Sequence, residues 1–406
     1  MTSTTTQTRH LVAVYPDAQA APDIWVPGHH AAQDAEAPPP FVLTTHTPPG
    51  TEATVIFPSV GMPGAAGVLR RLLEEVGFKV TGGNGDSASW MTAHDPVLGR
   101  TAYLGFTDLL GDDPLIGPAI PLGSLAICER LAAWHAAFGT HYRYTPGVSL
   151  TAFMRTRQGH AGWPKWLLRE RGPGGRLDDW QPPAMLRDLR YTTKTTARTT
   201  AQLHRWDMRR AYLNAASGAM LPTRRPEPTG DNPQGPGYIR IQASTVADAA
   251  LPFLPKPDRH GCLWVGTFTY EVLQEVATRL GPVIVDSITA PGTRHLRPWG
   301  EAIRDAQDNA SPELVPVIKR GYAAAIGLLN VPRGGVYRPD WRHLIVDYVA
   351  GSMLRRIFRV RKLMDGLMPS KVDIDSVWYQ TDDPQHVGAA LGEGPRMGNL
   401  RYEGVQ

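Results

Sequence analysis

The sequence has little cysteine and no long apolar run, and both absences exclude classes of protein. Cysteine occurs only at positions 128 and 262, which leaves no basis for a disulfide framework or a cysteine zinc site. No apolar stretch approaches the ~20 residues of a membrane span, and the opening MTSTTTQTRH lacks the apolar core of a signal peptide. We therefore expect a protein of a reducing cytoplasm that does not enter a membrane.

An excess of charge of one sign is also nearly absent. The 42 Lys and Arg residues against 38 Asp and Glu give a net charge of +4, which permits a polyanionic partner without requiring one. Local clustering is more informative, because five basic residues lie within SMLRRIFRVRK: Arg355, Arg356, Arg359, Arg361 and Lys362. Such a cluster fits either a phosphate-binding surface or a solvated helix face.

The length of 406 residues predicts two or three domains. Residues 1–50 are rich in Thr, Ala and Pro. Predicted strands at 53–60 and 101–109 and a helix at 124–139 then favour an α/β domain over residues 1–145. A Pro-, Gly- and Arg-rich segment over 146–200 is typical of a linker. A second region follows, with predicted strands at 237–246, 262–270 and 283–290 and long helices at 311–330 and 343–366.

Near the C-terminus, KVDIDSVWYQ places Asp373 and Asp375 one residue apart in an apolar and aromatic run. The alternation of Val372, Ile374 and Val377 predicts β-structure, such as a hairpin whose turn presents both carboxylates. Two carboxylates this close repel each other, and a bound divalent cation would remove that penalty. The alternative is a surface turn in which Asp373 accepts a backbone N–H bond and Asp375 is solvated. A third acidic residue elsewhere is needed to decide.

Three segments together resemble motifs of the family B DNA polymerases. HRWDMRRAYLNAASGAMLP, with Asp207 at a strand end and Tyr212 five residues later, resembles the first palm motif D-x-x-S-L-Y-P. KRGYAAAIG resembles the fingers motif K-x-x-x-N-S-x-Y-G, with Lys319 and Gly327 in register, and KVDIDSVWYQ resembles the Y-x-D-T-D-S hairpin. TPGVSLTAFMRTR and MLRDLRYTTKTTAR are similar to the joint between exonuclease and palm in the protein-primed branch of phages and linear plasmids. The resemblance covers residues 140–406.

The resemblance implies a fold, an activity and a location. The expected fold is an RNase H-like, exonuclease-like α/β domain over 1–145, a joint over 146–200, and an α+β palm over 201–406 with short helical fingers at about 300–337. The implied activity is template-directed DNA synthesis in a phage, plasmid or mobile element within a bacterial cytoplasm. Its partners would be a DNA template-primer and dNTPs, with a terminal or priming protein or a processivity partner as further candidates. Two Mg²⁺ or Mn²⁺ ions would serve as cofactors, because nucleotidyl transfer uses ions bridged by carboxylates from separate strands.

The resemblance also assigns roles to individual residues. Asp207 and Asp375 would be the metal ligands, and Asp373 a supporting acid in the catalytic set. Tyr212 would stack beneath the deoxyribose, and Lys319 would neutralise the leaving pyrophosphate. Gly327 of the fingers motif would belong to the same nucleotide-binding set. Main-chain N–H groups would hold the triphosphate, and they belong to Met208, Arg209, Arg210 and Ala211. Residues of the joint would bind DNA, and these are Arg190, Tyr191, Lys194 and Arg198.

Each assignment has a simpler alternative. Asp207 could cap a helix that begins at Met208, Tyr212 could be a core aromatic residue, and Lys319 could lie on a solvated helix face. The chain also departs from the family. Ala323, Ala324 and Ile326 replace Asn, Ser and Tyr of the fingers motif, Arg210 and Ala211 replace Ser and Leu of the first motif, and YTTK lacks the glycines of the joint.

Two larger departures concern whole domains. Little sequence follows the acidic hairpin, so a short or missing thumb with low processivity is expected. The sole D-x-E, Asp34 and Glu36, lies in AAQDAEAPPP rather than in a predicted strand, so we expect a nuclease-like domain without activity. A metal cluster formed by these acids with His29 and His30 is disfavoured, because such loops are usually solvated. The rival interpretation of the whole chain is a polymerase-derived DNA-binding or replication accessory protein that does not synthesise DNA.

Overall fold

The computed structural model describes most of residues 70–157 and 201–405, with short internal gaps, and the strand segments that precede and separate them. The chain divides into two compact units. The first comprises Met1–Phe153 with Asp305–Ala325, and the second comprises Met154–Arg304 with Ile326–Gln406. Within the described residues, no helix is both long and apolar enough to cross a membrane.

A seven-stranded mixed sheet forms the centre of the first unit, in the order β3-β2-β1-β4-β7-β6-β5. Its strands are β1 (Leu11–Val14), β2 (Asp23–Val26), β3 (His29–His30), β4 (Glu52–Phe57), β5 (Lys79–Gly82), β6 (Trp90–His94) and β7 (Thr101–Phe106). β1 pairs antiparallel with β2 and parallel with β4, which is parallel to β7. Three antiparallel strands continued by two parallel ones are the core arrangement of the RNase H-like α/β class, which confirms the fold class expected for this part of the chain.

The helices of the first unit are η2 (Gly117–Leu122), α2 (Ser124–Phe138), most of α3 (Pro146–Arg157) and most of α8 (Leu314–Leu328). α3 begins where a linker was predicted, so the first residues of that segment are a helix. Two glycines allow α3 and α8 to approach closely. A Cβ on Gly147 would lie 2.6 Å from the Cβ of Ala324, and one on Gly321 would lie 2.9 Å from Leu150 Cδ1.

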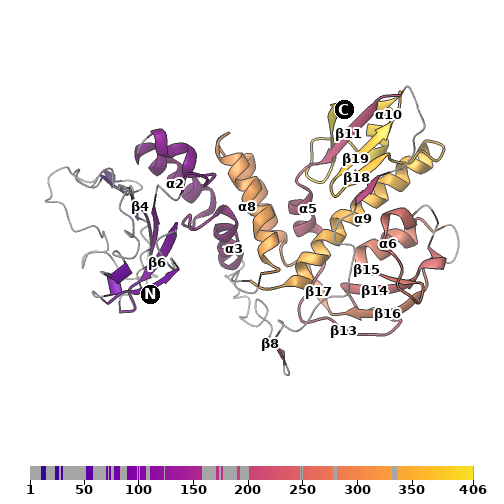
Figure 1. The fold of residues 1–406 in the computed structure, drawn as a ribbon, viewed down its shortest axis with the longest axis horizontal. Helices are drawn as coiled ribbons and strands as arrows, with labels where there is room; N and C mark the ends of the chain where they lie inside the picture. Colours follow the sequence, from indigo (N-terminus) through magenta and orange to yellow (C-terminus); the bar gives the residue numbers. More distant parts are fainter. Residues whose placement is uncertain are drawn as a thin grey trace, which may run out of the picture. The chain divides into compact units, whose positions relative to one another are not determined.

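The second unit contains two antiparallel sheets on either side of the long helix α9 (Pro339–Leu363) (Figure 1). The larger sheet has the order β10-β18-β19-β11-β20. Its strands are β10 (Arg190–Thr192), β11 (Leu203–Met208), β18 (Lys371–Asp373), β19 (Ser376–Gln380) and β20 (Leu400–Val405). The smaller sheet has the order β13-β16-β14-β15, from β13 (Glu227–Pro228), β14 (Gly237–Gln242), β15 (Cys262–Gly266) and β16 (Ile284–Thr289).

The remaining elements of the second unit connect or cover these sheets. The helices are α5 (Ala211–Gly218), α6 (Thr267–Glu275), α7 (Arg297–Asp308), α10 (Pro384–Leu391), η4 (Ala243–Thr245) and η5 (Leu251–Phe253). Two short pairs complete the set, β12 (Leu221–Pro222) with β17 (Gly292–Thr293) and β8 (Arg171–Gly172) with β9 (Gly175–Arg176). The long helices predicted over 311–330 and 343–366 are confirmed as α8 and α9, whereas α7 and α10 were not predicted.

Burial alternates along β11, so this strand has one core face and one open face, whereas residues 376–379 of the neighbouring β19 are all buried. His204, Trp206 and Met208 are buried, whereas Arg205 and Asp207 between them are half-buried. Successive side chains of a strand point to opposite faces, so this pattern places Asp207 on the open face.

The first turn of α9 is held by a buried ion pair. Arg338 and Asp340 are 1% and 2% exposed, and the guanidinium binds both carboxylate oxygens, with Nε 2.9 Å from Oδ1. Arg338 also donates to the carbonyl of Pro222, as does the indole N–H of Trp341, both at 2.9 Å. The guanidinium lies 4.3 Å from the Trp341 ring centre. These contacts satisfy a charge pair that would otherwise be costly to bury.

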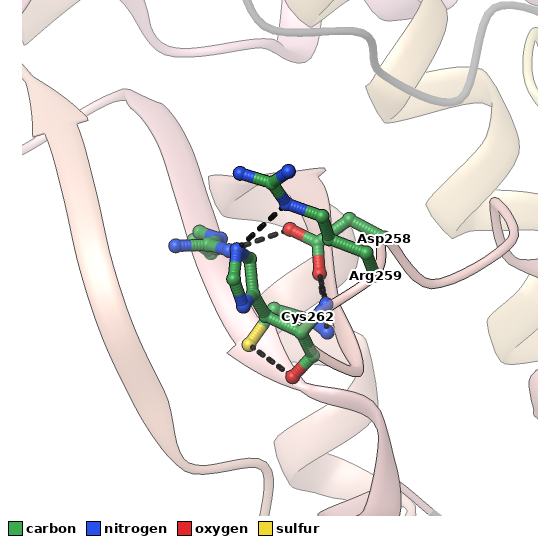
Figure 2. A network of polar contacts seen from close by, with 5 residues as sticks. Asp258, Arg259 and Cys262 are labelled. Atoms are coloured by element: carbon green, nitrogen blue, oxygen red, sulfur yellow. Dashed lines mark hydrogen bonds and ion pairs between the residues drawn. The ribbon is translucent and has the colours of Figure 1, made fainter.

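A hydrogen-bonded turn fixes the start of β15 (Figure 2). The Asp258 carboxylate accepts the backbone N–H groups of His260 at 2.8 Å and Cys262 at 3.0 Å, and Arg240 on β14 donates to it at 2.5 Å. These bonds, with that of the Cys262 N–H contributing most, lower the pKa of Asp258 to about 2. The turn thereby sets the register of β14 against β15, in which Gln242 lies opposite Cys262.

Candidate active site

Asp373 and Asp375 lie in a tight hairpin, as the sequence pattern predicts. β18 and β19 pair with Asp373 opposite Ser376, and Ile374 and Asp375 form the two-residue turn. Ile374 has a φ of 58°, in the left-handed region that two-residue hairpin turns of this class require. Both acidic residues are half-buried, so the turn presents them without enclosing them.

The strand that carries Asp207 lies beside this hairpin. β11 pairs antiparallel with β19, with Asp207 directly opposite Ser376. The backbone N–H of Met208 donates to the carbonyl of Asp375 at 2.8 Å, which ties the hairpin turn to the end of β11. Asp207 therefore belongs to a strand, and the alternative of a helix cap at this residue is wrong, because the helix begins four residues later at Ala211.

Register places the acidic residues in one row across the open face. Directly opposite residues of antiparallel strands share a face, so Asp373, Ser376 and Asp207 follow one another from β18 to β19 to β11. The row continues in register to Arg190 on β10 and to Arg401 on β20. Two carboxylates from separate strands thus flank one serine, with basic positions at both ends.

The Asp207 carboxylate has two polar neighbours that sequence reasoning missed. The Ser376 hydroxyl donates to Oδ1 at 2.5 Å, and a terminal nitrogen of Arg205 lies 3.8 Å from the same oxygen. Arg205 also donates to Ser376 Oγ at 3.2 Å. Strand parity could have placed Arg205 beside Asp207, but the contact with Ser376 depends on the register of two strands about 170 residues apart.

A row of basic and aromatic residues lies next to the acidic row, two residues along each strand. Arg205 is opposite Trp378, which is opposite Lys371. The Arg205 guanidinium carbon lies 5.2 Å from the Trp378 ring centre, and Lys371 Nζ lies 4.4 Å from it. Cations over an indole ring are favourable contacts, so Trp378 fixes the positions of both.

The predicted main-chain cradle over 208–211 is only partly available, which corrects the sequence prediction. The N–H of Met208 is bonded to Asp375, and that of Arg209 donates to the carbonyl of Asn399 at 2.9 Å. The Arg209 side chain is also engaged, because Nε donates to the Gly394 carbonyl at 3.0 Å. Met208 and Arg209 therefore hold the sheet and the loop before β20, and cannot offer these N–H groups to a phosphate.

A left-handed turn at Arg210 leads from β11 into α5. Arg210 precedes the helix with φ 52° and ψ 44°, a left-handed conformation that turns the chain from strand to helix. The first N–H groups of a helix have no acceptor within it and carry positive partial charge. Of the predicted cradle residues, Arg210 and Ala211 lie at this end of α5, and Tyr212 is half-buried in its first turn.

The other predicted site residues lie on several different elements. Lys319 is exposed on the part of α8 that belongs to the first unit, and Gly327 lies one residue before the end of that helix. The Tyr191 ring packs on Phe253, with ring centres 4.8 Å apart. Arg190 is in β10, and Lys194 and Arg198 lie outside the described residues.

One predicted basic cluster on α9 is structural in part. The half-buried guanidinium of Arg356 donates to the carbonyls of Ser352, Leu391 and Gly398, at 3.0, 3.1 and 2.7 Å. It therefore joins α9 to α10 and to the loop before β20, and is not part of a phosphate-binding surface. Arg355 pairs with Glu275, whereas Arg359 is exposed.

Across the part of the chain that the structure describes, no three His, Cys, Asp or Glu side chains gather closely enough to form a metal centre by themselves. The site thus offers carboxylates arranged in a row rather than a closed cage. Mg²⁺ is commonly held by one or two carboxylates together with water and substrate phosphates, and an open row of this kind suits that mode of binding.

Comparison with solved structures shows which known fold the chain resembles. No protein-family model matches the chain, and neither does any curated protein. Among solved structures, Phi29 DNA polymerase complexed with primer-template DNA and incoming nucleotides matches with a TM-score of 0.53 and 13% identity, over 86% of this chain and 76% of that one. Phi29 DNA polymerase with primer-template DNA alone gives 0.51 and 10%, over 86% and 75%. The resemblance to the protein-primed family B polymerases is therefore confirmed at the level of the fold.

Proposed function

We propose that this protein is a DNA polymerase that adds dNTPs to a 3′-hydroxyl on a primed template. The observation that carries the proposal is the junction of Asp207 with the acidic hairpin. Two strands from distant parts of the chain are joined by the Met208 to Asp375 backbone bond, and their register puts Asp207 and Asp373 on either side of Ser376. The fold shared with a polymerase complexed with DNA and nucleotides adds support.

In the proposed reaction the 3′ oxygen forms a bond to the α-phosphorus of the dNTP, pyrophosphate leaves, and the hydroxyl proton passes to solvent. Asp207 and Asp375 would hold two Mg²⁺ or Mn²⁺ ions, with Asp373 in support. The bound ions would activate the 3′-hydroxyl and offset the charge of the triphosphate. Asp207, Asp375 and Asp373 offer only carboxylate oxygens, and oxygen donors are the ligands that these hard cations prefer.

The protein's own groups have separate tasks in this scheme. Ser376 orients the Asp207 carboxylate through its hydroxyl hydrogen bond. The N–H groups at Arg210 and Ala211 would donate hydrogen bonds to phosphate oxygens at the positive end of α5. Tyr212 would lie beneath the deoxyribose and select against a 2′-hydroxyl.

The first unit is proposed to lack proofreading activity. A nuclease of this fold class would place a carboxylate on β1, and the residues of β1 are Leu, Val, Ala and Val. Degradation of a labelled 3′ end in the absence of dNTPs would contradict this part of the proposal.

The experiment is incorporation of labelled dNTPs on a primed template with Mg²⁺ or Mn²⁺. We expect synthesis by the native protein, a loss of at least 100-fold in Asp375→Asn, in line with removal of one essential electrostatic group, and unchanged synthesis in Asp382→Asn. Asp382 is an exposed acid outside the site, so it controls for the change of charge. Equal activity in all three proteins would refute the assignment of the site.

A second function is favoured by one observation. Arg205 already supplies a positive charge at Asp207, where a bound cation would otherwise be needed. A polymerase-derived accessory protein that binds DNA without synthesis would have this property. Salt-dependent binding of the primed template, with no incorporation by the native protein, would make this second function the better one.

A further inference from the structure

Arg205 lies on the same face of β11 as Asp207 and is directed at its carboxylate. The side chains are 34% and 23% exposed, and their closest charged atoms are 3.8 Å apart. The Ser376 hydroxyl stands between them, accepting from Arg205 at 3.2 Å and donating to Asp207 at 2.5 Å. One carboxylate oxygen therefore has both a hydroxyl donor and a cation beside it.

The position of this guanidinium is built into the sheet. Trp378 is 5% exposed and lies opposite Arg205 in register, with its ring centre 5.2 Å from the guanidinium carbon. Lys371 contacts the same ring from the next strand, at 4.4 Å. Stacking on an aromatic ring restricts a long side chain that would otherwise sample many rotamers. Arg205 is thus held beside Asp207 by Trp378 and Ser376 together.

We propose that Arg205 is the resident counter-ion of Asp207, a positioning residue that sets how tightly this site binds divalent cations. The inference rests on the proposed function, in which Asp207 is a metal ligand. A cation that binds Asp207 must do so against the positive charge of Arg205, so the guanidinium weakens binding while Ser376 keeps the carboxylate oriented. An arginine suits this task because it remains charged at every relevant pH.

The proposal predicts a gain when the charge is removed and the contacts are kept. Arg205→Gln retains an amide that can donate to Ser376 and lie on Trp378, but it has no charge. We expect this variant to bind Mn²⁺ at least about tenfold more tightly, because a divalent ion about 4 Å from a unit positive charge is disfavoured by more than this factor even at the dielectric constant of water. Arg205→Lys retains the charge and should bind Mn²⁺ within about twofold of the native protein.

The experiment measures Mn²⁺ affinity of the full chain from the relaxation of water protons, without DNA or nucleotide. The native protein, both Arg205 variants, Asp207→Asn and the control Arg359→Gln are compared. Arg359 is an exposed arginine on α9, so its variant removes the same charge away from the site and should leave the affinity unchanged. Melting temperatures of all five proteins identify any variant that is only less stable.

The outcomes separate this inference from the proposed function. If Asp207→Asn loses Mn²⁺ binding but Arg205→Gln binds Mn²⁺ no more tightly than the native protein, the counter-ion role is wrong and the metal site stands. If Asp207→Asn binds Mn²⁺ as well as the native protein, or if none of the proteins binds it, Asp207 is not a ligand. The proposed function then fails, and the inference fails with it.

Discussion

The carboxylate of Asp347 should make the stability of the second unit fall as the pH rises through the weakly acidic range. Asp347 lies in α9, is fully buried, and accepts the backbone N–H groups of Gly266 at 3.1 Å and Thr269 at 3.2 Å, at the start of α6. Burial raises its pKa from 3.8 to about 6 against the lowering effect of these bonds. It thus acts as an N-terminal cap supplied by a neighbouring helix.

The sign follows from proton binding. Between the unfolded pKa of 3.8 and the folded pKa of about 6, the folded protein binds more protons at Asp347 than the unfolded chain does. Stability contributed by this group is therefore fully present below pH 3.8 and is lost as the pH rises through about 6. The total loss is about 3 kcal/mol, of which about 1.3 kcal/mol falls between pH 5 and pH 7.

Urea unfolding of the native protein and of Asp347→Asn, at intervals from pH 5 to pH 7.5, measures this effect. Asn does not titrate, so the difference in unfolding free energy between the two proteins isolates Asp347 from other groups. The native protein should lose about 1 kcal/mol relative to the variant over this range. A difference that stays constant with pH, or one that grows in favour of the native protein, would refute the reasoning, since the N–H bonds would then outweigh burial.

Two further predictions concern close packing and buried charge. Gly266→Ala should lower the unfolding free energy by about 1 to 3 kcal/mol, because its Cβ would lie 2.2 Å from the Asp347 carboxyl carbon. Gly327→Ala is the control: this position is in open space on a helix, so the change should be neutral or stabilising by up to about 1 kcal/mol. Equal effects of the two changes in urea unfolding would contradict this prediction. Arg338→Met should lower stability by about 3 to 5 kcal/mol, because it leaves a buried carboxylate without its cation. Arg297 forms an exposed ion pair with Glu301, so Arg297→Met is a control that should lower the unfolding free energy by only about 0 to 1 kcal/mol. A similar melting temperature for the two variants would show that the buried pair is not stabilising.

Local pattern was sufficient for much of the fold and for the outline of the site. Alternation in KVDIDSVWYQ predicted the hairpin that β18 and β19 form, and helical periodicity predicted α8 and α9. These features depend on residues close together in the chain, so the sequence by itself determines them. The same holds for the assignment of Asp207 to the end of a strand, where neighbouring residues alternate between buried and half-buried.

Tertiary structure alone decided what each functional side chain contacts. The register of β11 against β19 brings Arg205 and Ser376 to Asp207, and the loop before β20 takes the N–H of Arg209 out of the predicted phosphate cradle. Arg356 likewise becomes a structural residue through the carbonyls of distant segments. The reason is physical: hydrogen bonds and ion pairs act over a few ångströms, and only the pairing of distant strands determines which groups come within that reach.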